Sequence, residues 1–212
     1  MENIINRKVS IISPCRNEVK FIDKFIHDLL KQNSQGIELE ILIADGESND
    51  GTRKKIESLA IKYGNIKLIK NPGKIVSKGL NLAINCSKSE FIIRMDIHTR
   101  YSKNYVYNIV QLLRKNDYQC VGGPWVPISR DFISKAIKLA FQSRVISGGA
   151  KSRSLSFNGL VDTVYLGAWQ REYLMNLGGF DENFIRNQDD LSEIEHDKIS
   201  EILPLENKKN IF

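Results

Sequence analysis

At residues 91–98 the chain reads Phe91-Ile92-Ile93-Arg94-Met95-Asp96-Ile97-His98, which predicts a buried strand with two polar side chains where it stops. Residues i and i+2 of an extended segment point the same way, so Asp96 and His98 can converge on one divalent cation. No thiolate or second histidine lies near them in sequence, which suits Mg²⁺ or Mn²⁺ better than a structural zinc. Taken alone, Asp96 is equally well explained as the turn residue of a strand end.

Two upstream segments have a similar arrangement of apolar run and polar turn. Val9 to Ser13 is a short β-branched run that breaks at the polar turn 14–18. A predicted helix follows, with apolar residues at helical spacing at Phe21, Ile22, Phe25, Ile26, Leu29 and Leu30. Leu39 to Ala44 predicts a second strand, which ends in the polar stretch 45–52.

The same alternation continues along the chain. Arg53 to Tyr63 predicts another helix, and Ile66 to Ile69 a third strand. Alternating strands and helices favour an α/β fold with a mostly parallel sheet, whose ligands bind beyond the carboxyl ends of the strands. Asp45 and Asp96 are both predicted to lie at such ends.

Three polar segments in this frame resemble the nucleotide-sugar half of family 2 glycosyltransferases of the GT-A fold. They are Ser13 to Glu18, Asp45 to Thr52 and Arg94 to His98, in this order and spacing. Downstream, Val161 to Trp169 and Gly178 to Glu182 resemble the acceptor half, most like the exopolysaccharide (succinoglycan-type) branch. The resemblance implies a Rossmann-like, mostly parallel sheet flanked by helices, with residues 1–190 forming one catalytic domain.

The family resemblance implies an inverting, metal-dependent transfer of a sugar from a nucleoside diphosphate to a glycan or lipid-linked acceptor, in cell-surface or extracellular polysaccharide synthesis. A cation bridging the diphosphate oxygens would stabilise the leaving group, and Asp96 and His98 are its expected ligands.

The nucleotide-sugar site is expected to contain Asp45 and Asp96, with Pro14, Arg16 and Glu18 at its rim. A carboxylate such as that of Asp45 can accept hydrogen bonds from a base or a sugar hydroxyl. Two alternatives stay open: Asp45 caps the following helix together with Asp50 and Thr52, and Arg16 simply pairs with Glu18.

The acceptor hydroxyl needs a general base. The resemblance places that base at Asp189, or second at Asp190. A Glu often precedes this acid in the family, whereas the chain has Gln188 there. An acidic surface turn is the alternative.

Three further features have two interpretations each. The stretch 147–154 contains glycines and basic residues, and it either contacts phosphate or forms a flexible loop. Trp125 and Trp169 either stack on a sugar ring or belong to the core.

The composition indicates an ordinary enzyme domain. Its 212 residues are 42% hydrophobic and 26% charged, enough for one core. No apolar run approaches the roughly 18 residues that span a bilayer, and the N-terminus lacks an apolar signal-peptide core. We therefore expect a cytoplasmic protein, with the inner face of the plasma membrane as an alternative location. Three cysteines without metal-ligand spacing indicate reduced thiols, with Cys15 in a packing role.

The net charge of +6 is compatible with three classes of partner. Nucleic acid is disfavoured because the basic residues are scattered and no nucleic-acid motif accompanies them. A nucleoside diphosphate sugar and a lipid-diphosphate acceptor are both anionic, as is a membrane surface, and all three fit the charge.

After Asp190 the sequence departs from the family pattern, and residues 191–212 are expected to be a divergent charged tail. The chain then resembles a truncated family member. Two other functions remain as alternatives: a non-catalytic nucleotide-sugar-binding relic, and a nucleotidyltransferase. The latter is disfavoured because no glycine-rich loop bearing Arg and Lys follows the first strand.

Overall fold

The computed structural model describes residues 7–115, 118–123, 159–161, 164–183 and 200–202. The strands are β1 (Arg7–Cys15), β2 (Ile37–Asp45), β3 (Ile66–Lys70), β4 (Phe91–Arg94), β5 (Cys120–Gly123), β6 (Gly159–Val161), β7 (Tyr165–Gln170) and β8 (Ser200–Ile202). The helices are α1 (Ile22–Leu30), α2 (Thr52–Tyr63), α3 (Val76–Cys86), α4 (Tyr105–Leu113) and α6 (Arg171–Asn176). The strands form one sheet in the order β3-β2-β1-β4-β7-β5-β8-β6.

The first four strands of that order are parallel and form the half of the sheet that the sequence predicts. Cys15 at the end of β1 pairs with Asp45 at the end of β2, and Asp45 pairs with Lys70 at the end of β3. On the other side of β1, Ile12 pairs with Arg94, the last residue of β4. The carboxyl ends of four strands therefore meet at one edge, which confirms the predicted α/β fold.

Strand β7 interrupts the parallel arrangement. It lies between β4 and β5 and is antiparallel to both. Beyond β5, β8 runs parallel to it and β6 runs antiparallel to β8. A strand formed by residues 165–170 thus joins the N-terminal parallel block to the rest of the sheet.

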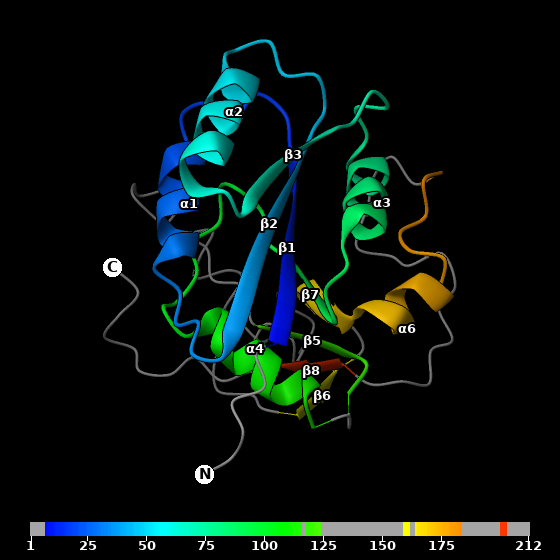
Figure 1. Ribbon diagram of the computed structural model, residues 1–212. Coiled ribbons are helices and arrows are strands. Elements are labelled where there is room, and N and C mark those ends of the chain that lie inside the picture. Colours follow the sequence, from blue (N-terminus) through cyan, green and yellow to red (C-terminus); the bar gives the residue numbers. More distant parts are fainter. Residues whose placement is uncertain (1–6, 116–117, 124–158, 162–163, 184–199, 203–212) are drawn as a thin grey trace, which may run out of the picture.

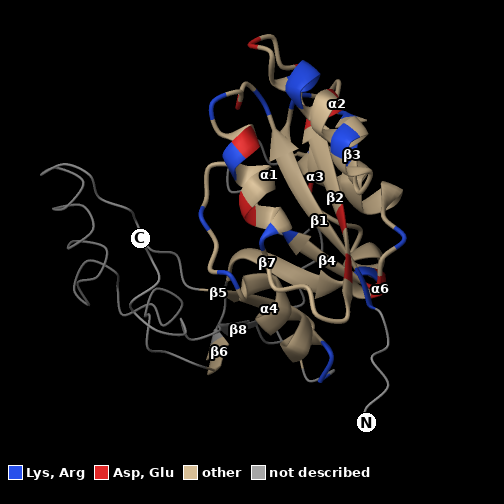
Figure 2. Ribbon diagram, turned by 60° about the vertical axis from the view of Figure 1, so that its left-hand side comes forward, with Lys and Arg blue, Asp and Glu red and all other residues tan. Residues whose placement is uncertain are grey.

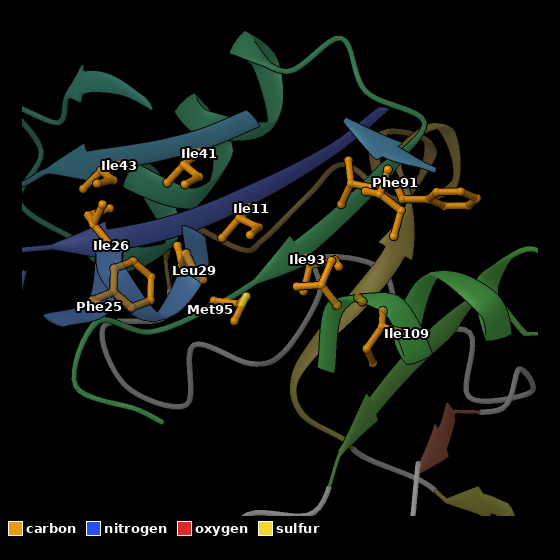
Figure 3. Close-up of a cluster of buried hydrophobic side chains, with 14 of the residues drawn as sticks. Ile11, Phe25, Ile26, Leu29, Ile41, Ile43, Phe91, Ile93, Met95 and Ile109 are labelled. Carbon is orange, nitrogen blue, oxygen red and sulfur yellow. The ribbon is translucent and has the colours of Figure 1, made fainter. Parts of the chain in front are cut away.

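Helices cover both faces of the sheet (Figure 1). Ile11, Ile41 and Ile93 of the central strands point to the face covered by α1, where Phe25 and Leu29 meet them (Figure 3). All of these side chains are buried, and each stabilises the fold by roughly 1.5–3 kcal/mol relative to exposure. Residues from α2 and α4 extend the same cluster.

Alternate residues of the same strands face the second layer. Ile12, Leu42 and Ile92 pack against Leu80 of α3 and Leu174 of α6. The near-continuous apolar runs of β1, β2 and β4 follow from this arrangement, since both faces of these strands are buried.

Trp169 belongs to this second core. It is buried and its ring meets that of Phe180 edge to face, with 5.7 Å between the ring centroids. Of its two interpretations, the structure therefore supports the core role. Trp125 and the stretch 147–154 lie outside the described residues.

Charged residues of both signs are interspersed on α1, as Figure 2 shows. Within the part of the chain that the structure describes, no helix combines the length and the apolar character that crossing a membrane requires.

Candidate active site

The polar turns after β1 and β2 are joined into one rim at the carboxyl edge of the sheet. The Asn17 N–H donates to Ser48 Oγ at 2.8 Å, and the Asn49 N–H donates back to Asn17 Oδ1 at 2.9 Å. The Glu18 N–H donates to Thr52 Oγ1 at 2.8 Å. Asn17 has a left-handed backbone with φ of 57°, which Asn tolerates better than most residues. The two loops therefore hold each other in place.

Asp45 ends β2 beneath this rim, and its side chain is fully buried. Arg53 of α2 donates to Asp45 Oδ2 from Nε at 2.9 Å and from Nη2 at 2.7 Å. The Ser48 N–H lies 3.3 Å from both carboxylate oxygens. A buried carboxylate needs such partners, because leaving it unpaired is costly.

Asp45 does not cap α2: the N-cap of that helix is Gly51, without a side-chain cap, and it is Asp50 that bonds the first helical residue. Asp50 Oδ1 accepts the Thr52 N–H at 3.0 Å and the Thr52 hydroxyl at 2.6 Å. These bonds lower the pKa of Asp50, the hydroxyl bond most. Asp45 is therefore a buried ion-pair partner beside the rim, and Asp50 organises the start of the helix.

Asp96 follows the end of β4 in a turn. The strand stops at Arg94, one residue earlier than expected, and the Thr99 N–H donates to the Asp96 carbonyl at 3.1 Å. Residues 96–98 are therefore not extended, so the period-two argument for Asp96 and His98 was wrong in its premise. The strand ends because its pairing with β1 ends at Ile12.

Two residues hold Asp96 from either side. The Asp96 N–H donates to Tyr101 Oη at 2.7 Å, and the Tyr101 hydroxyl lies 3.3 Å from the Asp96 carbonyl. Arg94 Nε lies 3.3 Å from Asp96 Oδ1, and both side chains are largely buried, at 8% and 15% exposure. The backbone of Asp96 and one of its carboxylate oxygens are thereby fixed.

Glu18 links the first loop to the turn after β4. Its Oε1 lies 3.8 Å from Nδ1 of His98, whose side chain is 60% exposed. Burial raises the pKa of Glu18, His98 lowers it, and the charges of Asp50 and Asp96 raise it. Glu18, Asp96 and His98 are thus electrostatic neighbours although they come from two loops.

The Asp96 carboxylate supplies the oxygen ligands that Mg²⁺ or Mn²⁺ prefers, whereas an imidazole such as that of His98 is more typical of other divalent transition metals. Among the described residues no group of three or more His, Cys, Asp or Glu side chains gathers to hold a metal ion. A two-ligand protein site is the kind that substrate phosphates complete.

Pro14 and Cys15 close β1 and Arg16 follows it. Pro14 is half-buried and pairs with Ala44 in the sheet. Arg16 is exposed, and no ion pair between it and Glu18 occurs within residues 7–115. Burial raises the pKa of the Cys15 thiol well above its ordinary value, and the charges of Asp45, Glu18 and Asp50 raise it further. This thiol stays protonated at neutral pH, in keeping with a packing role.

The sequence reasoning missed several residues of this edge. Arg53, Arg94 and Tyr101 each contact a predicted site acid. Lys74, in the turn after β3, pairs with Glu47 of the rim at 2.6 Å. Their positions in the sequence could have indicated them, because each lies within a few residues of a strand end or of the helix that follows it.

The second motif region is only partly described. The turn Gly178–Glu182 lies against α3, where Asn81 accepts the Phe180 N–H at 2.9 Å. Asp189 and Asp190, the predicted general bases, lie outside the described residues.

A parallel block of strands whose carboxyl edge gathers acids, basic residues and polar loops is typical of α/β proteins that bind ligands beyond the ends of their strands. Comparison with known proteins specifies the class. Residues 10–178 match the family model of glycosyl transferase family 2, and the chain belongs to that family.

Two curated relatives agree with this assignment. Succinoglycan biosynthesis protein ExoA of Rhizobium meliloti (strain 1021) is 28% identical over 181 residues, covering 84% of this chain and 54% of its own length. A dolichyl N-acetyl-alpha-D-glucosaminyl phosphate 3-beta-D-2,3-diacetamido-2,3-dideoxy-beta-D-glucuronosyltransferase of Methanococcus voltae is 28% identical over 189 residues, 85% of this chain and 59% of its own. The chain thus spans between half and two thirds of these relatives.

Solved structures show the same fold. S. aureus TarS residues 1–349 in complex with UDP superimposes with a TM-score of 0.70 at 16% identity, over 94% of this chain and 58% of that one. The mannosyltransferase PcManGT from Pyrobaculum calidifontis, in complex with GDP-Man and Mn²⁺, gives 0.63 at 18% identity, over 96% and 59%. The fold of this chain is therefore GT-A.

Proposed function

We propose that this chain transfers a sugar, with inversion, from a nucleoside diphosphate donor to a glycan or lipid-linked acceptor in cell-surface or extracellular polysaccharide synthesis. Relatives support the choice of substrates: one is named for succinoglycan biosynthesis, and structural neighbours bind UDP, UDP-GlcNAc or GDP-Man. Residues 1–190 would form the catalytic domain and residues 191–212 a tail outside the family pattern.

One observation carries the proposal: Asp45 ends β2 and Asp96 follows β4, the two strands that flank β1. The charges of both acids affect residues at or just after the end of β1, because Asp45 raises the pKa of Cys15 and Asp96 raises the pKa of Glu18. One ligand lying across the end of β1 could therefore meet both acids.

The nucleoside end of the donor would lie at Asp45. Arg53 engages Oδ2 twice, whereas Oδ1 has only the long contact from the Ser48 N–H. Oδ1 therefore retains capacity to accept a further hydrogen bond. Because the side chain is fully buried, a base or a ribose hydroxyl would reach it only after the rim above it moves. Pro14, Arg16 and Glu18 would shape the wall of this pocket.

The diphosphate end would lie at Asp96. Asp96 and His98 would hold Mg²⁺ or Mn²⁺, and the bound cation would neutralise charge on the departing diphosphate. Arg94 and Tyr101 would keep the Asp96 carboxylate at a fixed position, so that little reorganisation is needed when the donor binds.

The acceptor would be activated by a carboxylate at Asp189, or second at Asp190. A base that takes the hydroxyl proton on the face opposite the leaving group gives inversion in one displacement. Because the donor and a lipid-diphosphate acceptor are anionic, the net charge of +6 favours both. The reaction would take place in the cytoplasm, with the inner face of the plasma membrane as the alternative location.

Calorimetric binding of UDP and of GDP, each with and without Mn²⁺, tests the donor site. We expect Mn²⁺-dependent binding of one nucleotide that Asp96→Ala weakens by at least about tenfold. Glu57→Ala, an exposed acid on α2, is the matched control and should bind as the wild type. Binding that is indifferent to both Mn²⁺ and Asp96→Ala refutes the site.

Transfer of sugar from a nucleotide donor tests the proposed catalytic activity. The wild type is incubated with Mn²⁺, UDP-GlcNAc or GDP-mannose and lipid extracted from bacterial membranes, and sugar in the lipid phase is measured. Asp189→Asn should reduce transfer by about 10²- to 10⁴-fold while nucleotide binding persists. Binding without any transfer, equal in the wild type and Asp189→Asn, would instead identify a non-catalytic nucleotide-sugar-binding protein.

A further inference from the structure

One side chain, that of Asn81, attaches the turn Gly178–Glu182 to helix α3. Asn81 Oδ1 accepts the Phe180 N–H at 2.9 Å, and Asn81 Nδ2 donates to the Phe180 carbonyl at 2.8 Å. The same Nδ2 donates to Glu182 Oε1 at 2.9 Å. The amide therefore satisfies both backbone groups of Phe180, a residue 99 places away in sequence.

The turn is shaped to receive this amide. Gly179 has a φ of +76°, and a Cβ at this position would lie 2.6 Å from Asn81 Oδ1. Only glycine combines that left-handed backbone with so close an approach. Phe180 anchors the turn from the other side, because its ring is buried against Trp169.

The start of helix α3 is linked to the end of β2 through Asn71. The Asn71 N–H donates to the Asp45 carbonyl at 2.9 Å, and Asn71 Nδ2 donates to the carbonyl of Ile75, the residue before α3, at 2.9 Å. Gly79 lets α3 approach the sheet, since a Cβ there would lie 3.2 Å from that of Ala44 and 2.8 Å from Asn71 Nδ2. A rigid helix thus connects the end of β2 with the turn at Phe180.

We infer that Asn81 is a positioning residue that fixes the start of the segment leading to Asp189 and Asp190 relative to the donor site. The catalytic part of this inference rests on the proposed function, since it takes those acids to serve as the base. Among the described residues across this junction, the hydrogen bonds of Asn81 go to Phe180 and Glu182. It acts by setting where the chain after Glu182 begins, and a general base is sensitive to displacements of about 1 Å.

The chemistry of the contact explains why an amide is required. A carboxylate of the same shape, as in Asn81→Asp, could still accept the Phe180 N–H. It would have no donor for the Phe180 carbonyl and would lie beside the Glu182 carboxylate, where like charges repel. Asn81→Asp therefore tests the bonds, whereas Asn81→Ala removes the whole side chain.

Amide hydrogen exchange measures the attachment directly. In Asn81→Ala and Asn81→Asp, the peptide covering residues 174–183 should exchange roughly tenfold faster, because a lost hydrogen bond lets the turn open more often. Peptides from β1 and β2 should be unchanged. Asn85→Ala, an exposed residue one turn further along α3, is the matched control. Unchanged exchange at the turn in both Asn81 variants overturns the inference.

A second pair of variants covers the case in which Asn81→Ala folds poorly. Gly179→Ala places a methyl group against Asn81 Oδ1, so it should also speed exchange at residues 174–183. Combining it with Asn81→Ala removes the clash, and the added effect of Gly179→Ala should shrink by at least about threefold. Strictly additive effects would mean that the two residues do not interact, and would overturn the inference.

Kinetics separates positioning from general loosening. Asn81→Asp should bind UDP or GDP with Mn²⁺ within about twofold of the wild type, while kcat for sugar transfer falls by roughly tenfold or more at unchanged donor KM. Faster hydrogen exchange at the turn in Asn81→Asp together with an unchanged kcat refutes the positioning role. A wild type that binds nucleotide but transfers nothing refutes the catalytic proposal itself and with it this role, whereas hydrogen exchange still decides whether Asn81 holds the turn.

Discussion

The guanidinium of Arg53 donates two hydrogen bonds to the buried carboxylate of Asp45, from Nη2 at 2.7 Å and Nε at 2.9 Å. Asp45 is fully buried, whereas a third of the Arg53 side chain is exposed. The first turn of α2 is thereby fixed to the end of β2, at the place assigned to the nucleoside.

Arg53→Ala should destabilise the fold by about 2 kcal/mol, because it leaves a buried carboxylate without its cation. Urea unfolding followed by circular dichroism measures the change. Lys54→Ala, at the exposed neighbouring position, should stay within about 0.5 kcal/mol of the wild type. Equal stability of the two variants would show that the pair contributes nothing.

Tyr101→Phe should cost about 1–2 kcal/mol of stability, since the Asp96 N–H loses the hydroxyl that accepts it. It should also weaken Mn²⁺-dependent nucleotide binding by about tenfold, as loss of a residue that holds a metal ligand in place does. Calorimetry and urea unfolding give the two values. Tyr107→Phe, half-buried on α4, is the control. If Tyr101→Phe binds nucleotide with Mn²⁺ as tightly as the wild type, the Tyr101 contact does not position the metal site.

Gly167→Ala should destabilise the fold more than Gly64→Ala. Both glycines have left-handed backbones, with φ of +51° and +70°, and alanine costs about 1 kcal/mol in such a conformation. A Cβ at Gly167 would also lie 2.3 Å from the Trp169 ring, whereas nothing lies within 4 Å at Gly64. Overpacking of this kind adds about 1–3 kcal/mol. Equal losses in thermal unfolding would exclude the ring contact.

Cys15 should resist alkylation in the native protein. Its pKa is raised by burial and by nearby carboxylates, so the reactive thiolate forms only at a pH above the ordinary range, while Cys86 is exposed. Mass spectrometry after iodoacetamide treatment at pH 8 should find Cys86 modified at least about 100-fold faster than Cys15. In urea the two rates should converge. Rapid native labelling of Cys15 would contradict its protonated, packed state.

The first half of the fold was predictable from sequence because its strands are buried on both faces. Such strands appear as short β-branched runs. Strands β1 and β2 extend the predicted runs by one or two residues at each end, and β3 by one residue at its C-terminal end. Helix α1 followed from its apolar spacing. Helix α3 also has apolar residues at helical spacing, at Val76, Leu80, Ala83 and Ile84, although the small and polar residues Ser77, Gly79 and Asn81 lie among them.

The site was only partly predictable, because its decisive contacts join distant residues. The positions of Asp45 and Asp96 at or just after strand ends were predictable, while their roles in the site stay predictions. Their partners Arg53 and Tyr101 depend on how a loop returns, and the link from Asn81 to Phe180 depends on tertiary packing. The turn at residues 96–99 was mistaken for extended chain, since the apolar run continues one residue beyond the last sheet pairing.

Among the described residues, β7 is the neighbour of β4 on the side away from β1, and it comes from far along the chain. Incomplete synthesis or proteolysis before residue 165 would give a fragment that lacks β7. The backbone amides and carbonyls on that edge of β4 would then have no partner. Such an exposed strand edge pairs readily with the same edge of another copy. Because β7 lies between β4 and β5, which precede it in the sequence, we expect shortened fragments to aggregate rather than to form a stable nucleotide-binding half.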